Sequence, residues 1–280
     1  MKKLFRILAL FLLISFISPY GYSSEIVRVK NIKSDKSIYR PNVTEVLELI
    51  EEGDEEYWYG MYYADEKIGW LQALSKTYES ENFNQKIVEI FINMNLTFKM
   101  MGNEEKLIES TAEIKLSQIY QAKPPFRLIS YHEATQVDGL LSSVIGKKKG
   151  NRFKLEYKDN NEKNVREILL TNFNYSLYDV LALDTWFRKK PPEVNDMVAS
   201  RTFDFQTLEY ILNETTIQEI VKSKVSGVDY IYYKVNSLDK AEIEEEDFTS
   251  QFLIDQDGIA IKFFIADLEL RIESEENAKN

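Results

Sequence analysis

The 280-residue sequence contains no cysteine and a single histidine, His132. Without cysteine the chain forms neither a disulfide nor a lipid-modified cysteine, and cysteine-histidine catalysis is excluded. One histidine also argues against a histidine-based zinc site, and we expect no cofactor and no metal. His132 falls inside a predicted strand, where its neighbour Glu133 points to the opposite face. We therefore interpret His132 as a surface or edge-strand residue and not as a general base.

Positive charge is scarce as well. The chain carries 35 lysines and arginines against 46 aspartates and glutamates, which gives a formal net charge of -11. Nucleic acid and anionic membrane surfaces would both repel such a protein, so we expect neither as its main partner. The partner we expect is therefore an unknown protein or an apolar ligand. The apolar content of 44% is ample for a packed core.

The N-terminal residues have the pattern of a signal peptide. Lys2, Lys3 and Arg6 form a basic region and an apolar run follows from Ile7 to Ile17. Small residues before Ser23 predict cleavage near that position, so residues 1–23 are assigned to the signal peptide. The run is short for a membrane span, and we expect membrane attachment only if it stays uncleaved. The sequence thus predicts an exported protein, periplasmic or held in the cell envelope.

One stretch, from Val88 to Leu116, gives the clearest structural signal. Apolar residues occupy every second position from Val88 to Met100, with mostly polar residues between them. This period of two predicts a long, half-buried strand. The alternation resumes at Ile108 after a polar turn, which predicts a hairpin. Arms of this length are expected of a wide, strongly twisted sheet that curves around something.

Similar strand patterns, separated by turn residues, run from Tyr57 to Ile272. Gly60 and Gly69 interrupt the first two strands, which indicates bulges or a neighbour lying over bare backbone. The predicted fold class is α+β and β-dominated: a large curved antiparallel sheet, or half-barrel, around a central helix. Its domain covers residues 57–272.

Two helices are expected. In the lead-in, residues 24–56, Asn42 followed by Glu45 predicts the start of a short helix. A second helix is predicted near residues 176–188, where Ser176 and Asp179 form a similar start, and we expect it on the concave side of the sheet. The charged residues 273–280 are predicted to be a disordered tail.

The aromatic residues are the best candidates for a site. Six of them could line a cavity for an acyl chain or another apolar ligand: Trp58, Trp70, Phe91, Phe98, Trp186 and Phe187. Aromatic residues in strands normally pack against one another, and we favour this ordinary core. The sequence alone does not distinguish a filled interior from a hollow one.

The segment from Tyr57 to Tyr62, followed by Lys67-Ile68-Gly69-Trp70, resembles the opening hairpin of a known region. It is the non-catalytic N-terminal region of bacterial exported transglutaminase-like proteins, and the order of the later elements is similar too. Those proteins carry a cysteine, histidine and aspartate catalytic domain after this region, so no catalytic residue is implied here. The resemblance implies an accessory β module, similar to curved-sheet envelope folds such as the lipoprotein carriers.

Three functions follow, in order of preference. The first is a non-enzymatic exported binding or scaffolding module. The second is a carrier of a lipid or another apolar ligand inside the half-barrel. The third is a hydrolase that uses carboxylates alone, for which no spacing singles out a pair.

Overall fold

The computed structural model describes residues 25–30, 37–51, 53–101, 107–158, 165–189, 191–205, 207–225, 228–240, 248–255, 259–265 and 268–280. The predicted signal peptide lies outside these ranges. Within them, no helix is long and apolar enough to cross a membrane.

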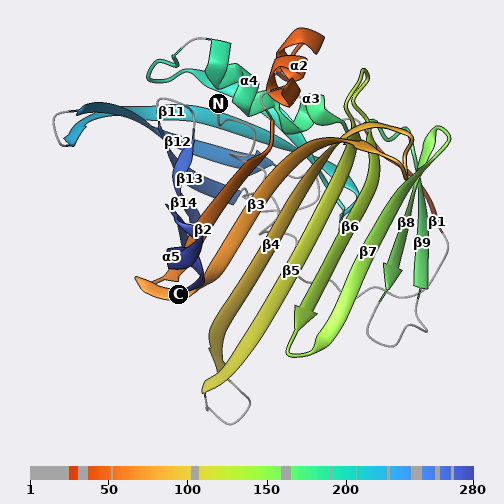
Figure 1. The fold of residues 1–280 in the computed structure, drawn as a ribbon, viewed down its shortest axis with the longest axis horizontal. Coiled ribbons are helices and arrows are strands. Elements are labelled where there is room, and N and C mark those ends of the chain that lie inside the picture. The colour runs from red at the N-terminus through yellow and green to blue at the C-terminus, as the bar shows by residue number, and fades with distance from the viewer. Residues whose placement is uncertain are drawn as a thin grey trace.

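Fifteen strands of the described residues form a single large open sheet (Figure 1). The strands are β1 (Glu25–Arg28), β2 (Glu55–Tyr63), β3 (Glu66–Ser80), β4 (Gln85–Met101), β5 (Leu107–Gln121), β6 (Leu128–Val137), β7 (Leu140–Lys149), β8 (Arg152–Lys158), β9 (Val165–Thr171), β10 (Met197–Asp204), β11 (Glu209–Val225), β12 (Val228–Lys240), β13 (Phe248–Asp255), β14 (Ala260–Ile265) and β15 (Leu268–Glu273). The predicted β-dominated, curved antiparallel sheet is confirmed.

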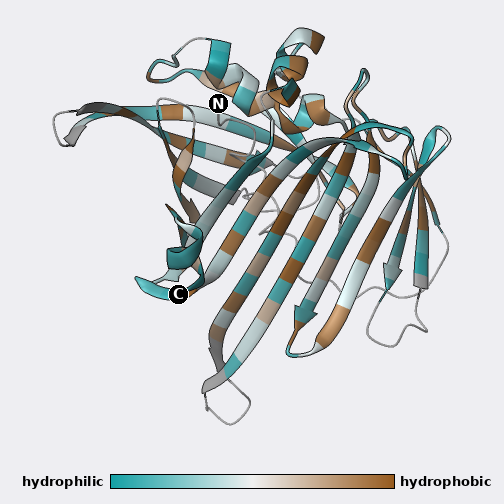
Figure 2. Ribbon diagram, in the orientation of Figure 1, coloured by the Kyte–Doolittle hydropathy of each residue, from teal (hydrophilic) through white to brown (hydrophobic). Residues whose placement is uncertain are grey.

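The long hairpin of β4 and β5 matches the predicted alternation. Val88, Ile90, Ile92 and Met94 on β4 are at most 3% exposed, and the residues between them face the other side. Figure 2 shows the resulting alternation of apolar and polar bands along the neighbouring strands. We call the side that carries these buried residues the core face, and the opposite side the outer face.

Two meanders build the sheet, and they meet at β2 and β15. Strands β2 to β9 lie side by side in sequence order, as do β10 to β15. The last strand of the second meander pairs antiparallel with the first strand of the other, so Leu270 lies opposite Met61. Neighbouring strands are usually close in sequence, and this pairing is the exception that makes one sheet out of two units.

The lead-in connects the two edges of the sheet. β1 pairs in parallel with β9 at one edge. Ten residues later Ile38 forms a parallel bridge with Ala199 of β10, the strand at the other edge. Ten extended residues reach about 35 Å at most, so the two edges approach each other and the sheet curls into a barrel-like shape. We call the region where the residues after β9 meet β10 and β11 the seam.

Helix α2 (Val43–Glu51) begins as predicted. The Glu45 backbone N–H donates to Asn42 Oδ1 at 3.0 Å, and the Asn42 N–H donates back to Glu45 Oε2 at 2.8 Å. This reciprocal pair is the capping box that the spacing of the two residues indicated. Val46, Leu49 and Ile50 bury the apolar stripe of the helix in the core.

The second predicted helix is split in two, α3 (Leu177–Val180) and α4 (Ala182–Lys189). Both lie with α2 at one end of the strands (Figure 1), and not at the centre of the concave side as predicted. Their position follows from their anchors. Ser176 forms a bridge with Arg127 beside the start of β6, and both helices contact the edge strand β10.

The C-terminal residues are ordered, and the predicted disordered tail is wrong. β15 continues to Glu273, and residues Glu275–Lys279 form helix α5. Ala278 is 1% exposed, and Lys279 Nζ lies 4.4 Å from the centroid of the Trp58 ring. The tail gains its order from the outer face of β2 and β3, a surface that lies more than 200 residues away in the sequence.

The core face is filled with side chains where the two meanders meet. Tyr59 packs edge-on against Phe263 at 5.4 Å between ring centroids, and Phe263 packs against Phe252 at 5.6 Å. All three residues are at most 1% exposed. A side chain with so little accessible surface touches no space large enough for water. This part of the interior is therefore packed and not hollow.

Candidate functional site

The structure does not bring the six predicted aromatic residues together. Trp58 and Trp70 lie on the outer face under Lys279 of α5, with 5.3 Å between their ring centroids. Phe91 is on that face too, because its neighbours Ile90 and Ile92 occupy the core face.

The other three predicted residues lie elsewhere. Phe98 is an even number of positions from Val88, so it belongs to the core face, and it is half-buried near the C-terminal end of β4. Trp186 and Phe187 are on α4, with their rings 5.1 Å apart, and Phe187 contacts Tyr233 of β12. His132 is exposed on the outer side of β6, as interpreted from the sequence. These positions are structural contacts, and the six aromatic residues do not line one cavity.

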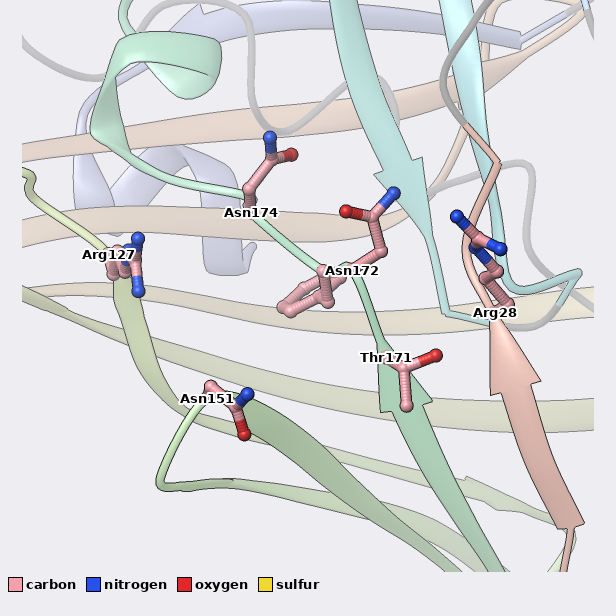
Figure 3. A pocket seen from close by; sticks show the side chains of 7 residues that line it. Arg28, Arg127, Asn151, Thr171, Asn172 and Asn174 are labelled. Atoms are coloured by element: carbon pink, nitrogen blue, oxygen red, sulfur yellow. The ribbon is translucent and has the colours of Figure 1, made fainter.

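A different set of residues forms a pocket of about 510 Å³ beside the seam. We call it the seam pocket, and its lining comes from four separate segments: Arg28, Arg127, Asn151, Thr171, Asn172, Phe173 and Asn174. Figure 3 shows Arg28 and Arg127 on opposite sides of the segment from Thr171 to Asn174. Its size is in the range of sites that bind small molecules.

Each segment is placed by the end of a regular element. Arg28 is the last residue of β1, and Arg127 immediately precedes β6. Asn151 lies in the turn between β7 and β8, and the segment from Thr171 continues from the end of β9. The pocket is therefore made where four strand ends meet, a position where polar side chains need not be buried.

Hydrogen bonds fix the floor of the pocket. Asn174 Oδ1 accepts from Tyr210 Oη at 2.7 Å and from Arg201 Nη2 at 3.1 Å. Asn172 has a positive φ of 62°, a conformation that asparagine tolerates better than most residues, and its Nδ2 donates to the Val29 carbonyl at 3.3 Å. Both side chains are therefore oriented before any ligand binds.

Phe173 anchors the same segment from below. Its ring lies 5.0 Å from Phe153 of β8 and 4.8 Å from Phe203 of β10, measured between centroids. This aromatic cluster extends to Phe205, which stacks on Tyr131 at 3.7 Å. The cluster joins the two edges of the sheet, so the pocket rests on packed and rigid structure.

The pocket has a positive electrostatic character. Two of its seven lining residues are arginines and none is acidic. Within the described part of the chain, neither guanidinium has an ion-pair partner. Nearby, burial lowers the pKa of Lys148, and the positive charge of Arg127 lowers it further. A local excess of positive charge in a protein with a net charge of -11 is unusual enough to point to a function.

Sequence reasoning missed this site. Lys147, Lys148 and Lys149 form a basic run beside a turn, which is also the pattern of an exposed hairpin tip. The remaining positive charge comes from Arg28 and Arg127, which are about 100 residues apart in sequence. The asparagines of residues 172–174 follow a strand, which is also the pattern of an ordinary loop. No local signal connects these segments.

Comparisons with known proteins identify no family for this chain. No protein family matches the sequence, and no curated protein does. One solved structure with a similar arrangement is a beta-barrel-like protein of the domain of unknown function DUF1849 from Brucella abortus, with a TM-score of 0.47 and 7% sequence identity. The match covers 78% of this chain and 94% of the other. The resemblance to transglutaminase-like proteins finds no support in these comparisons.

Proposed function

We propose that the protein is an exported, non-enzymatic binding module and that the seam pocket is its recognition site. The observation that carries this proposal is the pocket itself, with polar side chains held in place by Tyr210, Arg201 and the Val29 carbonyl. Preorganised polar groups lower the entropic cost of binding, which is why recognition sites have them. The basic and apolar pattern of residues 1–23 supports export.

The chemistry of the lining favours binding over catalysis. Arginine, asparagine and phenylalanine side chains do not change their protonation state near neutral pH, so they do not serve as general acids or bases. The Thr171 hydroxyl donates to the Val27 carbonyl at 3.3 Å, so it is held by a structural hydrogen bond. A hydrolase that used two carboxylates would require acidic residues in the pocket, and the lining supplies none.

The second candidate is a carrier of an apolar ligand, and one observation favours it. Leu140 and Leu141, at the turn between β6 and β7, are 65% and 50% exposed. An apolar molecule could cover them at the free end of the long strands. The packed core around Tyr59 and Phe263 weighs against a deep cavity, because both side chains are fully buried among protein atoms.

Native mass spectrometry of the mature protein, from about residue 24, distinguishes these functions. The protein is produced in bacteria and recovered from the envelope fraction without detergent. We expect a bound, water-soluble small molecule. The Asn151→Trp variant, which places a large side chain in the pocket, should lose it, whereas Lys149→Trp in the same hairpin but outside the lining should keep it.

Two other results would change the assignment. A bound lipid that Asn151→Trp retains and that organic extraction removes would favour the carrier. Recovery only in the cytoplasm with residues 1–23 intact, or an apo mass for the wild-type protein with envelope extract added, would contradict the proposed function. Thermal unfolding of both variants checks that each one folds.

A further inference from the structure

The proposed function leaves the chemical class of the ligand open, and the seam pocket restricts it. A guanidinium presents five N–H donors in a planar fork that matches the two oxygens of a carboxylate or a phosphate. Arg28 and Arg127 approach the pocket from opposite sides, as Figure 3 shows. The pocket therefore offers groups that can bind an anion from two sides.

The asparagines add a different kind of recognition. Because Tyr210 and Arg201 both donate to Asn174 Oδ1, the oxygen of this amide is occupied and its Nδ2 donor remains available. In Asn172 the opposite holds, since Nδ2 donates to Val29 and the Oδ1 acceptor remains available. A neighbouring donor and acceptor of this kind match hydroxyl groups, which both accept and donate hydrogen bonds.

The surroundings of the pocket exclude a cationic ligand. Burial lowers the pKa of Lys148, and repulsion by the positive charge of Arg127 lowers it further. Asp179, an acidic residue near the seam, is buried and accepts a hydrogen bond from Arg201 Nε at 2.7 Å. A ligand with a negative charge relieves the repulsion between the basic side chains, and a cation would increase it.

We propose that the seam pocket binds an acidic saccharide, that is, a sugar that carries a phosphate or a carboxylate group. This inference rests on the proposed function and deepens it. The arginines bind the acidic group, and the amides of Asn172 and Asn174 bind the hydroxyls of the sugar. A volume of about 510 Å³ accommodates one or two sugar rings.

Isothermal titration calorimetry of the mature protein tests this inference with four probes: glucose 6-phosphate, glucuronate, glucose and inorganic phosphate. We expect at least one of the two acidic sugars to bind about tenfold or more tightly than either glucose or inorganic phosphate. Arg28→Gln and Arg127→Gln should each weaken this binding about tenfold. Arg152→Gln removes the same charge from the same end of the hairpin without touching the pocket, and should leave affinity within about twofold.

Comparison of the four probes separates the parts of the proposal. Binding of glucose as tight as that of the acidic sugars would overturn the role of the arginines. Binding of inorganic phosphate as tight as that of glucose 6-phosphate would overturn the recognition of hydroxyls. Equal losses in Arg152→Gln and Arg127→Gln would indicate attraction by overall charge and not by the pocket.

The outcome is independent of the test of the proposed function. If none of the probes binds, while the native mass spectrum shows a soluble ligand that Asn151→Trp loses, the saccharide class is overturned and the binding module stands. If the spectrum shows no ligand and no probe binds, both proposals fail.

Discussion

Arg201 Nε donates a hydrogen bond to Asp179 Oδ1 at 2.7 Å, and the two side chains are only 12% and 4% exposed. The pair connects α3 to β10 behind the seam pocket. The other carboxylate oxygen of Asp179 accepts from the Ser176 backbone N–H at 2.9 Å, so the same residue caps the helix. A single carboxylate therefore holds the helix start and the edge strand together.

Replacement of Asp179 should destabilise the protein strongly. Asp179→Asn keeps the shape of the side chain but leaves the buried guanidinium of Arg201 without its counter-charge, and we expect a loss of about 3 kcal/mol in the free energy of unfolding. Urea denaturation followed by circular dichroism measures it. In the control variant Glu113→Gln, which breaks the exposed pair with Lys115, the change should stay within about 0.5 kcal/mol. Equal effects of the two substitutions would contradict the prediction.

Asp239 should make stability depend on pH. Burial raises the pKa of this carboxyl from 3.8 to about 7 in the folded protein. Its contribution to stability is fully present below about pH 4 and is lost as the pH rises toward 7, because the unfolded chain then releases a proton that the folded chain retains. The full difference corresponds to roughly 4 kcal/mol as an upper limit. With the Asn213 amide oriented so that its nitrogen faces Asp239, it donates a hydrogen bond to Asp239 Oδ1 at 2.8 Å, which favours the ionised carboxylate and makes this difference smaller.

The Asp239→Asn variant tests this dependence by denaturation at several pH values. It should match the wild-type protein near pH 4 and exceed its stability above pH 7. Glu269 provides a control of opposite sign, because the hydrogen bond from Arg271 lowers its pKa to about 2. Glu269→Gln should therefore be less stable than the wild-type protein at pH 7, with a difference that shrinks as the pH falls through 4 toward 2. A pH-independent difference in Asp239→Asn would refute the assignment.

Gly69 should not tolerate even a methyl group. A Cβ at this position would lie 2.0 Å from the carbonyl oxygen of Asn95 on β4. The backbone of β4 can move away from this Cβ only if β3 and β4 separate. We expect Gly69→Ala to cost about 2–3 kcal/mol in thermal or urea unfolding. Gly60→Ala should cost less, because the three atoms nearest its new Cβ belong to the end of the Glu273 side chain, which can move more easily than backbone. The reverse order of the two variants would contradict this explanation.

Helix α5 should be required for the environment of the two outer tryptophans. Ala278→Asp places a charge at a position that is 1% exposed, so we expect the helix to detach, with a loss of about 2 kcal/mol. Trp58 and Trp70 would then meet water, and the tryptophan emission should shift to longer wavelength. Asn280→Asp adds the same charge at an exposed position and should change neither quantity. An unshifted spectrum in Ala278→Asp would show that α5 does not cover the two rings.

Much of the fold could be predicted from the sequence because the elements depend on local patterns. The alternation from Val88 to Met94 and the capping pair of Asn42 and Glu45 both appear in the structure as expected. Gly69 lies at a register shift, and both Gly60 and Gly69 lie under close neighbours. The alternation and the capping pair need only residues that are near one another in the chain.

The early part of β11 lacks the hydrophobic alternation that marks the other strands. Asn213 and Thr215 are polar, yet they are 1% and 0% exposed. Their polar groups pair with Asp239 and with Ser237 across the sheet, at 2.8 Å and 3.3 Å. A period of two in hydrophobicity does not reveal a strand whose buried positions are polar.

The position of the site and the order of the tail could not be predicted because they depend on distant contacts. The seam pocket needs strand ends from four segments, and α5 needs the surface made by Trp58 and Trp70. The six aromatic residues share only their residue type. Phe91 and Phe98 lie an odd number of positions apart in one strand, so they point to opposite faces of the sheet. This spacing is visible in the sequence and is enough to show that Phe91 and Phe98 do not line the same cavity.

The pairing of β2 with β15 determines when the sheet can be completed. Met61 and Leu270 are partners although they lie 209 positions apart in the sequence, so the first meander keeps an unpaired edge until β15 is present. Closing so long a loop is entropically costly and slow. The backbone groups along this edge of β2 therefore stay unpaired while β3 to β14 are added, and β15 completes the sheet.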